Sequence, residues 1–135
     1  MNTIQDERFR RGWERLQEVD AESGERVIDS LQDVAPDLGR YVVEFAYGDI
    51  YGRPALDLRQ RQLITIAALT ALGGAERQLD VHVNAALNVG LTAEEVVEAL
   101  LHCLPYAGFP RVLNAIFVVQ RVFAERGVSP LRGEQ

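Results

Sequence analysis

The sequence predicts an all-α fold, a single-domain bundle of about six or seven helices. Apolar residues recur at intervals of three and four almost throughout, and no stretch shows the alternation typical of a strand. Glycines and prolines stand between the periodic segments, where they end or begin helices. The 135 residues suffice for one ordinary domain, which we expect to span residues 1–128, followed by a flexible tail at 129–135.

The N-terminal half is expected to contain three helices. The second ends before Pro36, whose ring and missing N–H disfavour continuation. The third begins at Asp37 and ends in a loop over residues 48–54 that is rich in glycine. The apolar stripes consist of Phe9, Trp13, Leu16 and Val19, then Val27, Ile28, Leu31 and Val34, then Leu38, Tyr41, Val42 and Phe45.

The C-terminal half is expected to contain four helices, over residues 58–72, 76–89, 93–107 and 110–126. The helix at 58–72 is apolar on most of its surface, so we expect it to be central and buried. The boundary signals are Asp57 as an N-cap, Gly73 and Gly74 as a stop, Gly90 as a C-cap, Thr92 with Glu95 as a capping box, Pro105 as a bend, Pro110 at a first helical position, and Gly127 beyond the last helix.

The composition excludes several chemistries. All 14 basic residues are arginines, so Schiff-base catalysis and a P-loop, which both need a lysine, are ruled out. A single cysteine cannot form an intramolecular disulfide or a CxxC redox pair. Two histidines exclude a three-histidine zinc site within one chain, and a metal site made of both histidines and a carboxylate has little support, because they lack HExxH-type spacing.

The net charge and the apolar runs limit the partners. A formal charge of −6 and a pI near 4.9 repel a phosphate backbone, so we expect no nucleic-acid partner. The longest nearly apolar stretch, residues 63–75, is shorter than the ~20 residues of a membrane helix, and we expect no membrane partner. The charged N-terminus does not resemble a signal peptide, and we expect a cytoplasmic protein.

His82 is the first candidate for chemistry. It lies between Leu79 and Ala86 at offsets of three and four, so it faces the same side as the apolar stripe and is expected to be partly or fully buried. Spacing alone leaves two interpretations open. The ring is either a core histidine satisfied by one carbonyl, or a general acid or base held in a dry pocket.

Glu98, His102 and Tyr106 follow one another at steps of four and therefore line one helix face. Such a row is either a solvated face or subunit contact, or it brings His102 and Tyr106 to the pocket that contains His82, where they could donate to a developing anion. Cys103 is expected on the buried side of the same helix, where it would act as a small apolar residue.

Three arginines lie in first turns of helices, where their charge opposes the helix dipole. For Arg61, either a bound carboxylate or an acidic neighbour in the fold could compensate. We interpret Arg59 and Arg111 as partners in ordinary surface ion pairs.

Three segments together carry a family resemblance. They are residues 59–69, residues 82–95 with the pattern HxxxAxxxGxTxxE, and residues 102–110 with the pattern YxGxP from Tyr106 through Gly108 to Pro110. With these patterns the chain resembles the gamma-carboxymuconolactone decarboxylase family over most of its length, from about Phe9 to Arg126. The resemblance implies the all-helical fold shared with alkylhydroperoxidase D, assembled as a trimer or a hexamer with sites near subunit contacts. Apolar stripes on nearly all helices agree with a homo-oligomer.

The resemblance also separates two chemistries. The peroxidase branch of this fold carries CxxCxxxH, and this chain has Ala75, Gln78 and His82 at those positions, with Gln62 near the place of that branch's glutamate. We therefore do not expect thiol peroxidase activity.

In the decarboxylase branch a small lactone dicarboxylate loses carbon dioxide without a cofactor. For this chain the resemblance implies His82, His102 and Tyr106 as catalytic residues, and Arg61, Gln62, Gly108 and Pro110 as substrate-binding residues, with no cofactor and no metal. Another small lactone or keto acid as substrate, or a catalytically silent oligomeric ligand-binding protein, are the alternatives.

Overall fold

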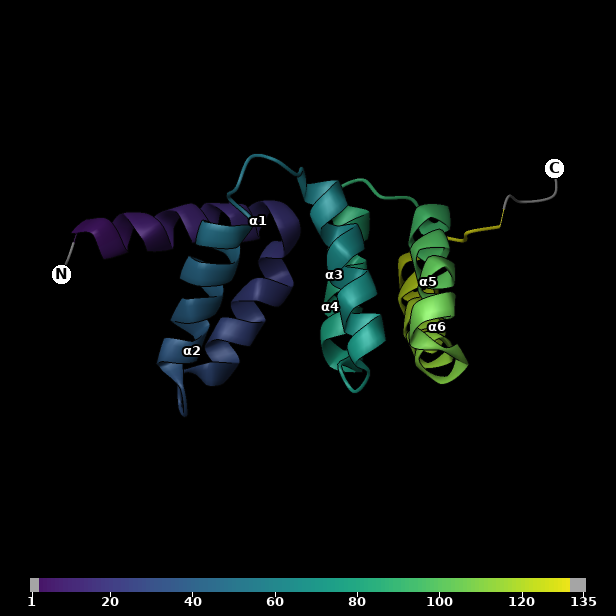
Figure 1. Cartoon of the computed structure of the whole chain (residues 1–135). Coiled ribbons are helices and arrows are strands. Elements are labelled where there is room, and N and C mark those ends of the chain that lie inside the picture. Colours follow the sequence, from purple (N-terminus) through teal and green to yellow (C-terminus); the bar gives the residue numbers. More distant parts are fainter. Residues whose placement is uncertain (1–2, 132–135) are drawn as a thin grey trace. The chain divides into compact units, whose positions relative to one another are not determined.

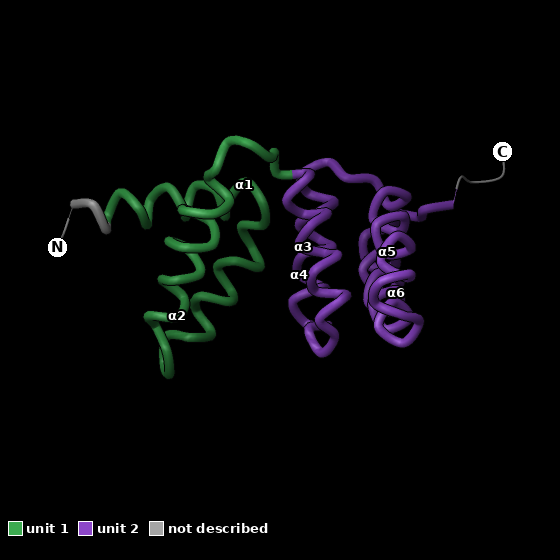
Figure 2. The backbone as a smooth tube through the Cα atoms, in the orientation of Figure 1, with its two compact units in different colours: residues 1–58 green, residues 59–135 purple. Residues whose placement is uncertain are grey.

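A computed structural model describes residues 3–131, with side chains from Asp6 onward. It contains six α-helices and one π-helical segment, and the described residues form no strand, so the all-α prediction is confirmed. The chain divides into two compact units, Met1–Leu58 and Arg59–Gln135 (Figure 2). The expected tail at 129–135 lies partly beyond the described residues, which stop before position 132.

The first unit begins with α1 (Thr3–Leu31), which is broken at Asp20. Asp20 has the extended angles φ −164° and ψ 87°, and its Oδ1 accepts a hydrogen bond of 3.2 Å from the backbone N–H of Ser23. This is the geometry of an N-cap, so Asp20 opens the second half of α1. The two helices predicted for this region are therefore present, separated by a single capping residue.

The next helix is longer than predicted. α2 (Pro36–Tyr41) continues directly into η1 (Val42–Ile50), and the ribbon at α2 is drawn as one unbroken helix (Figure 1). η1 is a π-helical segment and includes Gly48. The prediction that Gly48 begins a loop is wrong. A Cβ atom at Gly48 would lie 3.1 Å from the carbonyl oxygen of Arg8, so this glycine permits close packing of η1 on α1 and does not end the helix.

Charged side chains join the helices of the first unit. Glu44 is 5% exposed, and its carboxylate lies 3.5 Å from Arg8 and 3.8 Å from Arg40. Arg8 also donates to Asp49, with distances of 2.6 Å and 3.0 Å to Oδ2. Arg8 thus binds two carboxylates of η1 and ties the start of α1 to that segment.

The second unit contains α3 (Leu58–Leu72), α4 (Glu76–Asn88), α5 (Ala93–Ala107) and α6 (Phe109–Arg126), within one residue of the predicted ranges (Figure 1). The capping box at the start of α5 is present in both directions, with Thr92 Oγ1 3.0 Å from the N–H of Glu95. Gly73, Gly74, Gly90 and Gly127 have the positive φ angles that suit glycine at helix ends.

α4 and α5 both pack against α6, and the core between them is apolar. α3 contributes to this core along one face only, because Ile66 is fully buried while Ile64 and Leu72 are 55% and 68% exposed. The prediction that this helix is buried on most sides is therefore wrong for the single chain. The core residues are Ile66, Leu79, Val83, Ala86, Leu91, Ala93, Val96, Leu100, Ala115, Val118, Val119, Val122 and Phe123.

Among the helices described, none combines the length and the apolar character that crossing a membrane requires.

Candidate functional site

In the second unit, the polar side chains of Gln62 on α3 and His82 on α4 contact each other. Gln62 is fully buried, and its Oε1 lies 3.1 Å from Nδ1 of the half-buried His82. Both helices also contribute to the apolar core, α3 with Ile66 and α4 with Val83. The prediction that His82 is at least partly buried is confirmed, and its partner is a side-chain amide.

Arg61 precedes Gln62 on α3 and is half-buried. The backbone there is helical, and the hydroxyl of Thr65 donates to the carbonyl of Arg61 at 2.8 Å. The structure thus holds a guanidinium next in sequence to the glutamine that contacts His82. The second unit thus carries the guanidinium of Arg61 on α3 and the imidazole of His82 on α4.

An open cavity of about 860 Å³ is formed by α3 and α5. Both helices contribute apolar side chains to the lining of this cavity. The α5 segment also contributes three carboxylates and one imidazole to the lining. Among the described residues, the lining includes His102 but not His82, Gln62 or Tyr106. The lining residues are Leu63, Ile64, Ala67, Thr92, Glu94, Glu95, Glu98, Ala99, Leu101, His102 and Cys103.

His102 and Tyr106 share one face of α5, as their spacing predicts. Their ring centroids are 5.9 Å apart, His102 is exposed, and Tyr106 is 82% exposed. The structure therefore brings these two rings together with each other, and it separately brings His82 together with Gln62. A common pocket for His82, His102 and Tyr106 stays a prediction.

Gly108 and Pro110 form the junction of α5 and α6. Gly108 has φ 88° and ψ 165°, its N–H donates to the carbonyl of Leu104 at 3.1 Å, and its own carbonyl accepts from Val112 at 3.3 Å. Only glycine adopts this conformation readily, and Pro110 suits the first turn of α6 because no backbone donor is needed there. Each residue thus has a structural role, and their contact with a substrate stays a prediction.

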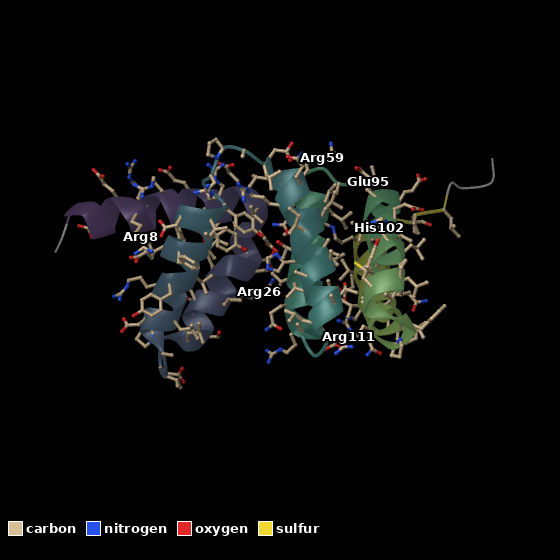
Figure 3. The ribbon with its side chains drawn as sticks, viewed as in Figure 1. Arg8, Arg26, Arg59, Glu95, His102 and Arg111 are labelled. Carbon is tan, nitrogen blue, oxygen red and sulfur yellow. The ribbon has the colours of Figure 1, made fainter. Side chains whose placement is uncertain are left out.

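Arg59 and Arg111 differ in what they bind. A nitrogen of Arg59 lies 3.1 Å from both carboxylate oxygens of Glu95, which confirms the predicted surface ion pair (Figure 3). The hydrogen bonds from Thr92 and the charge of Arg59 hold the pKa of Glu95 below its usual value, because together they outweigh burial, which raises this pKa. The ion pair predicted for Arg111 is not present among the described residues. Its Nε donates to the carbonyl of Leu72 at 3.5 Å, where a cation meets the unsatisfied carbonyls at the C-terminus of α3.

Cys103 is 8% exposed at the wall of the cavity, as predicted for a buried apolar role. Burial raises the pKa of its thiol, which disfavours the nucleophilic thiolate. The positions of a CxxC pair are occupied by Ala75 and Gln78. Within the described part of the chain, no group of three or more histidine, cysteine, aspartate or glutamate side chains could hold a metal ion.

The structure also shows a set of contacts that sequence reasoning missed. Asp80 of α4 binds Arg121 of α6 at 2.9 Å, and Arg126 of α6 donates to Asn88 at 2.8 Å and to Asn84 at 3.3 Å. These contacts join the polar side of α4, the helix that carries His82, to α6. The signal was the spacing of Asp80, Asn84 and Asn88 by four residues, which places all three on one side of α4.

The chain is similar in sequence to several known proteins. The sequence profile of the carboxymuconolactone decarboxylase family matches residues 36–121. A protein of Acinetobacter baylyi named 4-carboxymuconolactone decarboxylase is 36% identical over 126 residues, which cover 93% of each chain. A protein of Metarhizium robertsii named nitrosuccinic acid decarboxylase is 36% identical over 80 residues, 59% of this chain and 55% of that one.

A third relative, named as an uncharacterized 15.0 kDa protein of Paracoccus denitrificans, is 32% identical over 97 residues, which cover 71% of this chain and 72% of that one. The family profile covers the helices that carry Gln62, His82, His102 and Tyr106, and the Acinetobacter relative matches almost the full chain. The chain therefore belongs to the carboxymuconolactone decarboxylase family.

Proposed function

We propose that the protein decarboxylates a small lactone dicarboxylate of the gamma-carboxymuconolactone type without a cofactor, in the cytoplasmic catabolism of aromatic acids. Family membership and two relatives named as decarboxylases support a carboxy-lyase that acts on a small acid. The observation that carries the proposal is the hydrogen bond of 3.1 Å that anchors His82 at one ring nitrogen, with Arg61 next to its partner Gln62.

Decarboxylation requires a place for the electron pair that carbon dioxide leaves behind. In a conjugated lactone the substrate itself accepts this pair and forms a dienolate, so the protein needs only to hold the substrate and to supply a proton. Arg61 suits the first task, because a guanidinium binds a carboxylate with two parallel hydrogen bonds. His82 suits the second, because an imidazole gains and loses protons near neutral pH.

The remaining predicted residues complete this proposal. His102 or Tyr106 donates a hydrogen bond to the developing negative charge. Gly108 and Pro110 border the substrate at the junction of α5 and α6, and Gln62 binds it beside Arg61. This mechanism does not include oxidation by a thiol pair, because Ala75 and Gln78 stand at the positions of the two cysteines.

The test is an assay of the purified protein with gamma-carboxymuconolactone, in which carbon dioxide release is followed. In His82→Ala we expect kcat to fall by about 100-fold or more, the contribution of a positioned general acid. In Arg61→Ala we expect kcat/KM to fall by about 10-fold to 100-fold through KM, the loss of a charge-assisted hydrogen bond. Arg77→Ala removes an exposed arginine from the first turn of α4 and serves as the matched control. Undiminished turnover in His82→Ala would contradict the mechanism.

A second candidate substrate is a small nitro-substituted acid. The Metarhizium relative named nitrosuccinic acid decarboxylase supports it, and a nitro group, like a conjugated lactone, can accept the electron pair of a departing carbon dioxide. Turnover of nitrosuccinate in the same assay, without turnover of the lactone, would favour this candidate. A dicarboxylate that raises the melting temperature without any turnover would favour a ligand-binding protein.

We also propose that the protein is a homo-oligomer, a trimer or a hexamer. Phe109, Leu113 and Phe117 follow one another at steps of four along α6 and are 67%, 48% and 59% exposed. We call these three residues the α6 stripe. An apolar stripe left open on a single chain is typical of a face that another subunit covers.

A further inference from the structure

The first unit contains a cavity of its own, with a volume of about 300 Å³. Charged side chains of α1 form part of its lining, and η1 with the turn that follows it forms the rest. The α1 residues have the spacing of a single helix face, and they are Arg11, Glu14, Arg15 and Glu18. We call this space the α1/η1 cavity.

Two glycines keep side chains out of the α1/η1 cavity. Gly48 lines it, and a Cβ atom there would lie 3.1 Å from the carbonyl oxygen of Arg8. Gly52 also lines it, and a Cβ atom there would collide with the carbonyl oxygen of Gly48. This part of the wall is therefore backbone. A volume near 300 Å³ is at the lower end of the range for small-molecule sites, so the cavity suits a small ligand.

The α1 segment beside the cavity is basic although the whole chain is acidic. Residues 8–15 contain four arginines and one glutamate, whereas the chain has a net charge of −6. Three of the four arginines bind carboxylates, Arg8 that of Asp49 at 2.6 Å, Arg10 that of Glu14 at 3.6 Å and Arg15 that of Glu18 at 3.4 Å. Both glutamates of the lining thus have an arginine partner.

Arg11 is the fourth arginine of this segment. Among the side chains that the structure describes, it forms neither an ion pair nor a hydrogen bond, and it affects Asp49 only as a charge at a longer distance. Its guanidinium therefore adds to the α1/η1 cavity a positive charge that no carboxylate of the fold pairs with. A guanidinium cannot lose this charge near neutral pH, and it carries five N–H donors.

Tyr47 of η1 supplies a second donor. It is 7% exposed, and within the described part of the chain its hydroxyl has no hydrogen-bond partner. The fully enclosed side-chain oxygen without a partner in that part is Oδ2 of Asp20, so the Tyr47 hydroxyl still reaches open space, and Tyr47 lines the α1/η1 cavity. Burial, with smaller effects of Tyr51 and Asp20, raises the pKa of Tyr47, so the hydroxyl keeps its proton.

We propose that the α1/η1 cavity binds a small carboxylate monoanion, held by the guanidinium of Arg11 and the hydroxyl of Tyr47. A carboxylate accepts two parallel hydrogen bonds from a guanidinium and has lone pairs left for a hydroxyl. A single negative charge matches the single unpaired arginine, whereas a phosphate dianion would add repulsion from Glu14 and Glu18. The site is independent of the proposed decarboxylation, whose residues all belong to the second unit.

The test is a titration of the whole protein with sodium acetate, followed by NMR of the arginine Nε–H groups and the tyrosine rings. Sodium chloride keeps the ionic strength constant. Spectra of Arg11→Met and Tyr47→Phe assign the two signals that matter. We expect both signals to shift in a saturable way with a Kd of about 1–10 mM, as suits a ligand of so few atoms. Shifts that do not saturate, or that chloride alone produces, would overturn the proposal.

Each variant is read through the residue that it leaves intact. In Arg11→Met the Tyr47 ring should report an affinity about tenfold lower or less, because the charge-assisted hydrogen bonds are lost. In Tyr47→Phe the Arg11 signal should report a loss of about threefold to tenfold. Arg26→Met is the matched control, since it removes the same charge from an exposed position of α1 that pairs with Glu22. We expect its affinity to stay within about twofold of the parent.

Three further measurements make the result specific. Tyr47→Phe should melt within a few degrees of the parent without acetate, because its hydroxyl has no partner to lose, so a lower affinity would not come from unfolding. His82→Ala should bind acetate at Arg11 as the parent does, whatever its turnover. Parental affinity in Arg11→Met would overturn the site, and inorganic phosphate that binds as tightly as acetate would overturn its assignment to a carboxylate.

Discussion

Gly12 of α1 lies directly against the backbone of Val43 in η1. A Cβ atom at Gly12 would collide with the carbonyl oxygen of Val43 and come within 2.7 Å of its carbonyl carbon. The obstacle is backbone, which cannot turn aside as a flexible side chain could. Close contact of α1 with η1 therefore depends on a residue without a side chain.

Gly12→Ala should destabilise the protein although alanine favours helices. Separation of the two backbones is expected to cost about 1–3 kcal/mol, as in other overpacked sites. In Gly39→Ala of α2 the new Cβ would meet Ile28 at 3.6 Å, an ordinary contact, and we expect a gain of up to about 1 kcal/mol from helix propensity. Urea denaturation followed by circular dichroism measures both, and equal effects of the two substitutions would contradict the packing argument.

The ion pair of Arg8 and Asp49 should make stability depend on acidity. The hydrogen bonds from Arg8 lower the pKa of Asp49 below its ordinary value of 3.8. A carboxyl whose pKa is lowered by folding stabilises the folded state above its unfolded pKa, and this contribution is lost as the pH falls through the folded pKa.

We therefore expect Asp49→Asn to lower the melting temperature at pH 7, and the difference from the parent to shrink once the pH falls below about 4. Asp37→Asn is the control, because Asp37 is largely exposed and its pair with Arg40 should contribute little. Thermal melts over a pH series test this. A difference that stays constant down to pH 2 would argue against the assigned pair.

Cys103 should be slow to react and unnecessary for turnover. It is 8% exposed, and burial raises its pKa, so little thiolate exists near neutral pH. We expect iodoacetamide to label the native protein at less than about a tenth of its rate with the unfolded chain, and Cys103→Ala to retain the turnover of the parent. Hydroperoxide reduction that disappears in Cys103→Ala would contradict the exclusion of thiol chemistry.

The α6 stripe should decide the assembly state. Replacement of Phe117 by glutamate places a charge in the middle of the stripe, where burial against a second subunit would be costly. We expect Phe117→Glu to sediment as a single chain while the parent sediments as an oligomer. Val34→Glu alters an exposed apolar side chain outside the stripe and should leave the mass unchanged. A parent that already sediments at 15.1 kDa would exclude the oligomer.

The sequence by itself determined the helices and most of their ends. The capping box of Thr92 and Glu95, the positive φ of Gly127 and the place of Pro110 are local effects that involve neighbours within a few positions. The same holds for the exclusion of a thiol pair, which depends only on which residues stand at positions 75 and 78. His82 was also identified as a partly buried histidine, because helical spacing alone places it beside the apolar stripe.

The tertiary structure decided what these residues touch. The pairing of His82 with Gln62 joins positions 20 apart, and the contact of Arg111 with the carbonyl of Leu72 joins positions 39 apart. Gly48 stays inside a helix because it packs closely on α1, which outweighs its low helix propensity. Periodicity and capping report on a chain's immediate neighbours, whereas a hydrogen bond between two helices depends on how those helices pack, and so the partner of His82 became known only from the fold.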